Sequence, residues 1–292
     1  MSETQQRGAL GALVLGGIFL GCSPILVRVS HVGPIATAFW RQALALLPIA
    51  LMFGRRGAGG DARSRSVGDV VVAALPGACL AGDLIAWHIS LHMTSIANST
   101  LLANLAPIFV TLGAWLLFRE RVRPAFLVGM AVALGGAFVL MGQSLSFGRT
   151  HILGDALGVV TAMFYGSYIV TVSRLVGGYT TATIVTWSAT ATSLVLLPIA
   201  LASGDVLLPH SAHGWAVLLG LALFSHAGGQ SLIAYALAHL PASFSAVGLL
   251  AQPVGAAVLA WAMLAEPLGW LQALGGAIVL AGILLARRAS RR

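Results

Sequence analysis

The chain has 292 residues, of which 58% are hydrophobic and only 8% are charged, and its mean hydropathy is +0.94. A soluble domain is about a quarter charged, so this composition excludes a water-soluble globular fold and indicates that lipid is the solvent. The formal net charge of +8 comes from 16 basic residues, all arginine, and 8 acidic residues. Such a basic balance is typical of nucleic-acid binding, but the positions of the arginines favour another interpretation.

Ten apolar segments follow one another along the chain, each close to the ~20 residues that a helix needs to cross a bilayer. Short connections separate them, no segment is left for a soluble domain, and Cys22 and Cys79 lie inside the segments. We therefore predict an all-α membrane protein of ten transmembrane helices, with no cofactor and no metal site. In chain order the segments are Gly8–Ser30, Pro34–Phe53, Asp69–Ser90, Ser95–Phe118, Pro124–Met141, Ile152–Ser173, Thr180–Ala202, His213–Ala238, Pro241–Ala265 and Gly269–Ala286.

The arginines predict which side of the membrane each loop occupies. Three of the 16, namely Arg28, Arg41 and Arg149, lie elsewhere; the other 13 fall at the N-terminus, in even-numbered loops or at the C-terminus. With ten spans these positions share one side, which the positive-inside rule makes the cytoplasm. We predict a multi-pass protein of the bacterial inner membrane with both termini cytoplasmic, and we expect no nucleic-acid partner.

The sequence also repeats itself. Sliding the chain by 146 residues aligns the two halves, about 1–146 and 147–292, without gaps. Each half then holds five helices, an odd number, so the halves cross the membrane in opposite directions. Inverted repeats of this kind characterise secondary transporters, which bind substrate near the midplane between the halves. The matched pairs are Arg28 with Arg174, Pro107 with Pro253, Trp115 with Trp261, Glu120 with Glu266, Gly129 with Gly275 and Gly136 with Gly282.

Several stretches resemble the EamA-type repeat of the drug/metabolite transporter superfamily. In the first half these are Phe39–Ala43, Asn98–Pro107, Glu120 and the glycine-rich Gly129–Gly142; in the second half it is Leu264–Gly276. The resemblance covers almost the whole chain, once per half. Among characterised members, the chain looks most like the YddG-type amino-acid exporters.

This resemblance implies a basket of ten helices around a central cavity that is lined mainly by the third, fourth, eighth and ninth helices. Members of the superfamily move amino acids, other metabolites and drugs. One departure from internal symmetry concerns Arg41, because the repeat places Trp187 at the corresponding position. Whatever Arg41 does is therefore done by one half alone.

Two charged residues lie deep inside predicted spans. Asp83, in the third, is the only acid well within a span, and Trp87 follows it on the same helix face. A charge at this depth costs ~2.5–3.5 kcal/mol on insertion scales, so such residues usually face a cavity or a partner. Asp83 either meets a substrate ammonium, carries a coupling proton or pairs structurally with Arg41. Arg41 either receives a substrate carboxylate or neutralises Asp83 and helix ends.

Equivalent helices carry equivalent prolines, Pro107 and Pro253. A proline inside a helix removes one backbone hydrogen bond, and paired weak points suit the hinges of a gate, although proline is also ordinary in membrane helices. Asn104 and Gln252 stand beside them as candidate substrate contacts or as interhelical hydrogen bonds. Glu120 and Glu266, at equivalent helix ends, are assigned to capping or gate contacts.

The remaining candidates lie in the eighth and sixth helices. His226 and Gln230 share a face at a spacing of four, and we expect them to line the cavity; with no third ligand evident, a metal site is not expected. Tyr165 and Tyr168 are candidates for aromatic cavity walls, although aromatic residues also belong to interfacial belts.

These observations predict a secondary transporter that exports amino acids and related metabolites by alternating access. Its expected partners are a small-molecule substrate and membrane lipids, with no protein partner evident. A multidrug or organic-cation exporter of the same fold is the alternative, and a receptor or scaffold without transport is a further one. We predict no enzyme, because no nucleophile–base pair, phosphate loop or catalytic metal motif is found.

Overall fold

The computed structural model describes residues 3–57, 67–142, 148, 151–264 and 269–290. Within these ranges every regular element is a helix, as predicted. Nine helices or helix runs there are long and apolar enough to cross a membrane, and the shorter apolar Ala242–Val258 lies in the ninth predicted segment. Glu266 and Arg149 lie outside the described ranges.

The ten predicted segments correspond to helices or runs of helices in order. The seventh helix of the structure has the predicted bounds at both ends, and four segments are broken into two or three pieces. The helices are α1 (Glu3–Gly21), α2 (Ser23–Arg28), α3 (Pro34–Gly57), α4 (Val67–Met93), α5 (Ile96–Ala103), α6 (Ala106–Phe118), α7 (Pro124–Met141), α8 (Ile152–Leu175), α9 (Thr181–Ala202), α10 (Ala212–Gly220), the π-helix η3 (Leu221–Gln230), α11 (Ser231–Leu237), α12 (Ala242–Gly248), α13 (Ala251–Leu264) and α14 (Trp270–Ser290).

The fourth and ninth segments break at corresponding places. Between α5 and α6 the Leu105 amide donates to the Leu102 carbonyl at 3.0 Å, and between α12 and α13 the Leu250 amide donates to the Val247 carbonyl at 3.1 Å. These tight bonds span three residues instead of four, so the α-helical ladder is interrupted there. Pro107 lies in the first turn of α6, where its missing amide costs little. The prolines therefore mark helix breaks rather than bends of a continuous helix.

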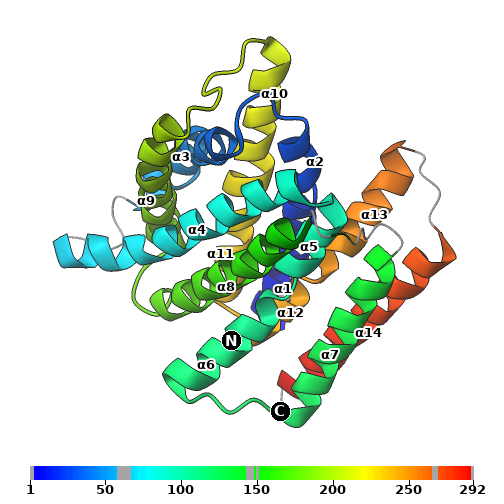
Figure 1. The fold of residues 1–292 in the computed structure, drawn as a ribbon. Coiled ribbons are helices and arrows are strands. Elements are labelled where there is room, and N and C mark those ends of the chain that lie inside the picture. Colours follow the sequence, from blue (N-terminus) through cyan, green and yellow to red (C-terminus); the bar gives the residue numbers. More distant parts are fainter. Residues whose placement is uncertain (1–2, 58–66, 143–147, 149–150, 265–268, 291–292) are drawn as a thin grey trace.

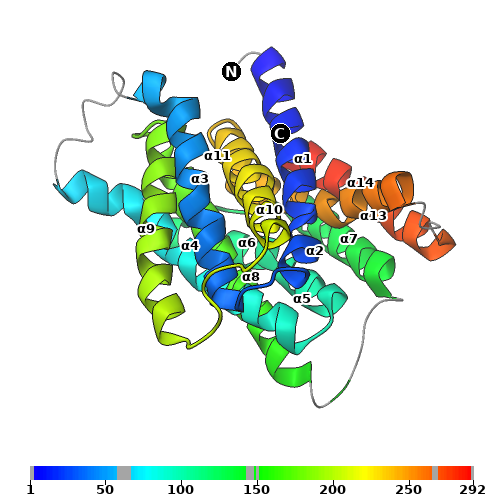
Figure 2. The same ribbon diagram turned by 90° about the horizontal axis from the view of Figure 1, so that it is seen from above.

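The helices pair across the halves. Figures 1 and 2 both show α7 beside α14 and α3 beside α9, and these pairs are in close contact, as are α4 with α8 and α1 with η3 and α11. A shift of 146 residues exchanges the members of the α7–α14 and α3–α9 pairs. It also turns the contact of α4 with α8 into that of η3 and α11 with α1. The contact pattern thus follows the repeat found in the sequence.

Glycines make the α7–α14 contact. A methyl group on Gly129 would meet Ala286, and one on Gly275 would meet Leu140, which is the same contact shifted by 146 residues. The backbones approach so closely that only glycine fits. Because a higher number on α7 meets a lower number on α14, the helices are antiparallel, as inverted halves require. We call this contact the glycine seam and define it by Gly129, Gly136, Gly275 and Gly282.

We predict that Gly136→Ala destabilises the protein and that Gly135→Ala does not. A β-carbon at Gly136 would lie 2.5 Å from the Val279 amide nitrogen, whereas one at Gly135 meets nothing within 4 Å. Overpacking of this kind costs about 1–3 kcal/mol. The melting temperature of the purified protein in detergent checks the difference. Equal melting temperatures for the two variants would show that the seam is not tightly packed.

Candidate functional site

A cavity of about 240 Å³ lies among the helices. Its walls come from α1 and α2, α4, α5 and α6, α8, and α12 and α13, with Arg41 from α3, Gln230 from η3, and Leu140 and Met141 from the end of α7. The third, fourth and ninth predicted helices line it as expected. The eighth contributes Gln230 alone, while the first and sixth contribute more than expected.

Most of the candidate residues meet in this cavity. Tyr168 and His226 are not among the lining residues, and both are buried. Tyr168 stacks behind the cavity on Tyr165, with ring centroids 5.8 Å apart. The candidates that line the cavity are Arg41, Asp83, Trp87, Asn104, Pro107, Tyr165, Gln230, Gln252 and Pro253.

The π-helix explains why His226 and Gln230 separate. The sequence argument assumed an α-helix, in which residues four apart share a face. Leu221–Gln230 is instead a π-helix, whose hydrogen bonds span five residues. Residues four apart therefore no longer stand in line, and Gln230 reaches the cavity while His226 lies buried elsewhere. A role for His226 or Tyr168 in binding substrate stays a prediction.

The two buried charges face the same cavity without touching. Arg41 is 3% exposed and Asp83 is 7% exposed, and no ion pair within 4.0 Å joins them. The Arg41 guanidinium lies over the Trp87 ring, 5.7 Å from its centroid, a cation–π contact that holds it in place. Arg41 Nε and Nη1 are buried and have no hydrogen-bond partner in this part of the structure. Direct neutralisation of Asp83 by Arg41, one of the alternatives above, is not observed.

Further polar groups in the walls also lack partners within the described ranges. They are the hydroxyls of Thr100 and Thr161 and the amide nitrogen of Asn104. Buried polar atoms are nearly always hydrogen-bonded, so this cavity has the donors and acceptors to bind a polar molecule or ordered water. Thr161 was missed by the sequence analysis, although it precedes Tyr165 by four residues and so shares its helix face.

A polar cluster fixes one wall of the cavity. Asp155, in the first turn of α8, accepts hydrogen bonds from Thr94 Oγ1 at 2.7 Å and from Asn98 Nδ2 at 3.1 Å. These bonds hold the start of α5 against α8. Ser95 caps α5 by accepting a bond from the Asn98 amide at 3.0 Å, which satisfies one of the free amides at the helix start. The position of Thr100 and Asn104 on this short helix follows from these anchors.

The cavity extends toward one end of the helix bundle. Its lining reaches Ile25 in α2, Ile96 at the start of α5 and Met141 at the end of α7. At the opposite end α12 packs on α6. The cavity is therefore closed beyond α12 and α6 and reaches the other side between α5 and α13, whose residues line facing walls.

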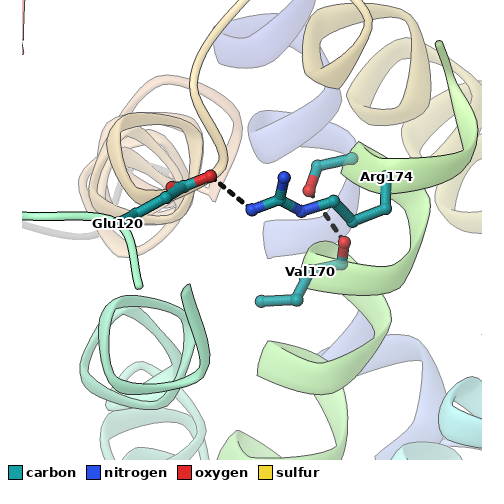
Figure 3. A network of polar contacts seen from close by, with 4 residues as sticks. Glu120, Val170 and Arg174 are labelled. Atoms are coloured by element: carbon teal, nitrogen blue, oxygen red, sulfur yellow. Dashed lines mark hydrogen bonds and ion pairs between the residues drawn. The ribbon is translucent and has the colours of Figure 1, made fainter. Parts of the chain in front are cut away.

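An ion pair stands at the closed end (Figure 3). Arg174, at the end of α8, donates to the Glu120 carboxylate after α6. The guanidinium also lies over the Phe118 ring, 3.6 Å from its centroid. The two side chains are 42% and 51% exposed, so the pair sits at the rim of the bundle. Arg28, which the repeat equates with Arg174, donates instead to the Leu91 carbonyl.

Comparison with known proteins agrees with this architecture. The model of the EamA-like transporter family matches residues 7–142 and again residues 152–288. A transporter without assigned substrate from Archaeoglobus fulgidus is 27% identical over 97% of each chain. A probable terminal-alkyne amino-acid exporter from Streptantibioticus cattleyicolor is 31% identical over 72% of this chain and 71% of its own.

Two further matches cover nearly the whole chain. The pseudopaline exporter CntI of Pseudomonas aeruginosa is 26% identical over 97% of this chain and 96% of its own. A crystal structure of a protein superposes over 100% of both chains with a TM-score of 0.81 and 18% identity. At that identity the structural match speaks for the fold alone.

Proposed function

The chain belongs to the EamA-like transporter family, and we propose that it exports amino acids and related small metabolites across the bacterial inner membrane. The observation that carries this proposal is the cavity between the helices, which holds two buried charges and several polar groups without partners. Such groups are costly within a membrane unless they serve a substrate, a partner or water. Two relatives named as exporters, one of them for an amino acid, support it.

The proposed mechanism is alternating access between two inverted halves, about 1–146 and 147–292. The glycine seam relates them by a shift of 146 residues. The helix breaks near Pro107 and Pro253 stand at the cavity wall, where they would act as hinges. Closing α5 onto α13 while α12 leaves α6 would transfer the cavity from one face of the membrane to the other.

A second candidate function is export of organic cations. Asp83 would neutralise such a substrate, and the aromatic rings of Trp87 and Tyr165 in the same cavity would attract it. Both candidates use the same cavity, so they differ in which molecules exchange and not in where they bind.

An exchange assay tests the proposed function. We expect proteoliposomes that contain the purified protein and unlabelled amino acids to take up labelled amino acids from a panel of twenty. Asp83→Asn keeps the shape of the side chain but removes its charge, and we expect it to reduce exchange at least about tenfold, the effect of 1.4 kcal/mol, with normal protein levels. Asp205→Asn, the same change at an exposed loop residue, is the control. Exchange by Asp83→Asn at the wild-type rate would make Asp83 a structural residue.

The orientation predicted from the arginines can be tested with cysteine variants. With Cys22 and Cys79 replaced by serine, we expect a membrane-impermeant maleimide to label His210→Cys in intact spheroplasts. Gly177→Cys should be labelled only after the membrane is permeabilised. Both positions are exposed, and they lie in odd- and even-numbered loops respectively. Labelling of both from the same side would contradict the predicted topology.

The Arg174–Glu120 pair is expected to hold the cytoplasmic side closed. An exposed pair contributes only about 0.2–1 kcal/mol, so Arg174→Glu or Glu120→Arg should raise the opening frequency by up to about fivefold. The double variant exchanges the two charges and should restore the wild-type value. The rate at which a maleimide modifies Leu240→Cys from the cytoplasmic face of inside-out vesicles measures this, since Leu240 lies beside the pair. Equal rates in all variants would exclude the pair from gating.

A further inference from the structure

The cavity contains one positive and one negative charge, and these are its only charged groups among the lining residues that the structure describes. Arg41 comes from α3 and Asp83 from α4, and no ion pair joins them. We propose that the cavity selects zwitterions, with the substrate carboxylate on Arg41 and the substrate ammonium on Asp83. This inference rests on the proposed function and names the substrate class of the same site.

Arg41 is prepared to receive a carboxylate. Its Nε and Nη1 atoms are the two donors that a carboxylate engages side by side, and both are buried without a partner. The Trp87 ring beneath the guanidinium fixes its plane and uses none of its hydrogen-bond donors. A buried guanidinium with two free donors is costly, and a carboxylate in the cavity would satisfy both.

Asp83 supplies the opposite pole. Its side chain is nearly buried, faces the cavity and lies one helical turn from Trp87, which contacts Arg41. Because Asp83 and Arg41 share a cavity but do not pair, a molecule with its own positive and negative groups fits between them. Each charge would then have an opposite charge beside it.

Charge balance excludes the simpler ions. A lone organic cation would pair with Asp83 and leave Arg41 buried beside an added positive charge. A lone anion would do the reverse. In a medium of low dielectric constant both complexes hold an uncompensated buried charge, which is strongly unfavourable. A zwitterion leaves no charge uncompensated, so the cavity discriminates by the presence of both groups.

The rest of the cavity accommodates an uncharged side chain. The walls contributed by α1, α7, α12 and α13 are largely apolar, with leucines at positions 20, 140, 249 and 250. The substrate class that follows is amino acids with free amino and carboxyl groups and a neutral, mainly apolar side chain. Both charges come from the first half, since the repeat places Trp187 and Gly229 at the corresponding positions. The substrate therefore binds in one fixed orientation.

The test compares L-leucine and L-phenylalanine with their amides, their N-acetyl derivatives and tetraphenylphosphonium, using wild-type protein in proteoliposomes. The amides lack the carboxylate and the N-acetyl forms lack the ammonium. We expect the free amino acids to exchange at least tenfold faster than either derivative and than tetraphenylphosphonium. This comparison needs no variant, so it holds even where a substitution prevents folding.

Variants then assign each pole to one residue. Arg41→Gln should abolish the preference over the amides, and Asp83→Asn should abolish the preference over the N-acetyl forms. Arg41→Lys, which keeps the charge but loses the paired donors, should retain part of the preference. Arg288→Gln, the same change at an exposed arginine, is the control. Gel filtration and melting temperature confirm that each variant is folded.

The outcomes separate the two proposals. If the wild type exchanges an amide or tetraphenylphosphonium as fast as the free amino acid, the selection of zwitterions is overturned and the transport function stands. An unchanged preference in folded Arg41→Gln would overturn the assigned orientation. If none of the probes is exchanged, the proposed export of amino acids fails together with this inference.

Discussion

In the hydrocarbon core of a bilayer, a backbone amide or carbonyl that leaves its helix finds no water to bind. Spanning segments are therefore helical, and a helix can be interrupted only where protein or an aqueous cavity satisfies the freed groups. The breaks in this protein obey that constraint. The α5–α6 and α12–α13 junctions both border the cavity, where Asn104 and Leu250 occupy corresponding positions. The same constraint that imposes helices thus locates the site, because it confines irregular backbone to the cavity wall.

Side-chain charge is subject to the same constraint. Arg41 and Asp83 are buried at a depth where neither is tolerated without compensation, and the surrounding helices hold them apart instead of joining them. The Trp87 ring supports the guanidinium, while hydrogen bonds from Thr94 and Asn98 to Asp155 anchor the adjacent wall. The fold stabilises the frame around the two charges and leaves the charges themselves facing the cavity.

The sequence was a good guide to the spans and a weaker one to the details of the site. Length and hydropathy predict α7 at both ends, because lipid thickness and Pro124 determine where it lies. Arg41 and Asp83 could be singled out by their cost in lipid. The π-helix could not, because nothing in Leu221–Gln230 distinguishes it locally from an α-helix, and its formation depends on packing against α1 and α3. That single change of helical period explains why Gln230 lines the cavity and His226 does not.

The glycine seam has a property that concerns more than packing. Gly129 meets Ala286 while Gly275 meets Leu140, and Gly136 meets Val279 while Gly282 meets Ala133. Every contact is the image of another under the same shift, which is the self-complementarity of a two-fold dimer interface. One five-helix half thus carries both surfaces of the contact. A half-length chain that inserted in both orientations would present matching faces to its own second copy, so a gene encoding one half already specifies the seam of the whole.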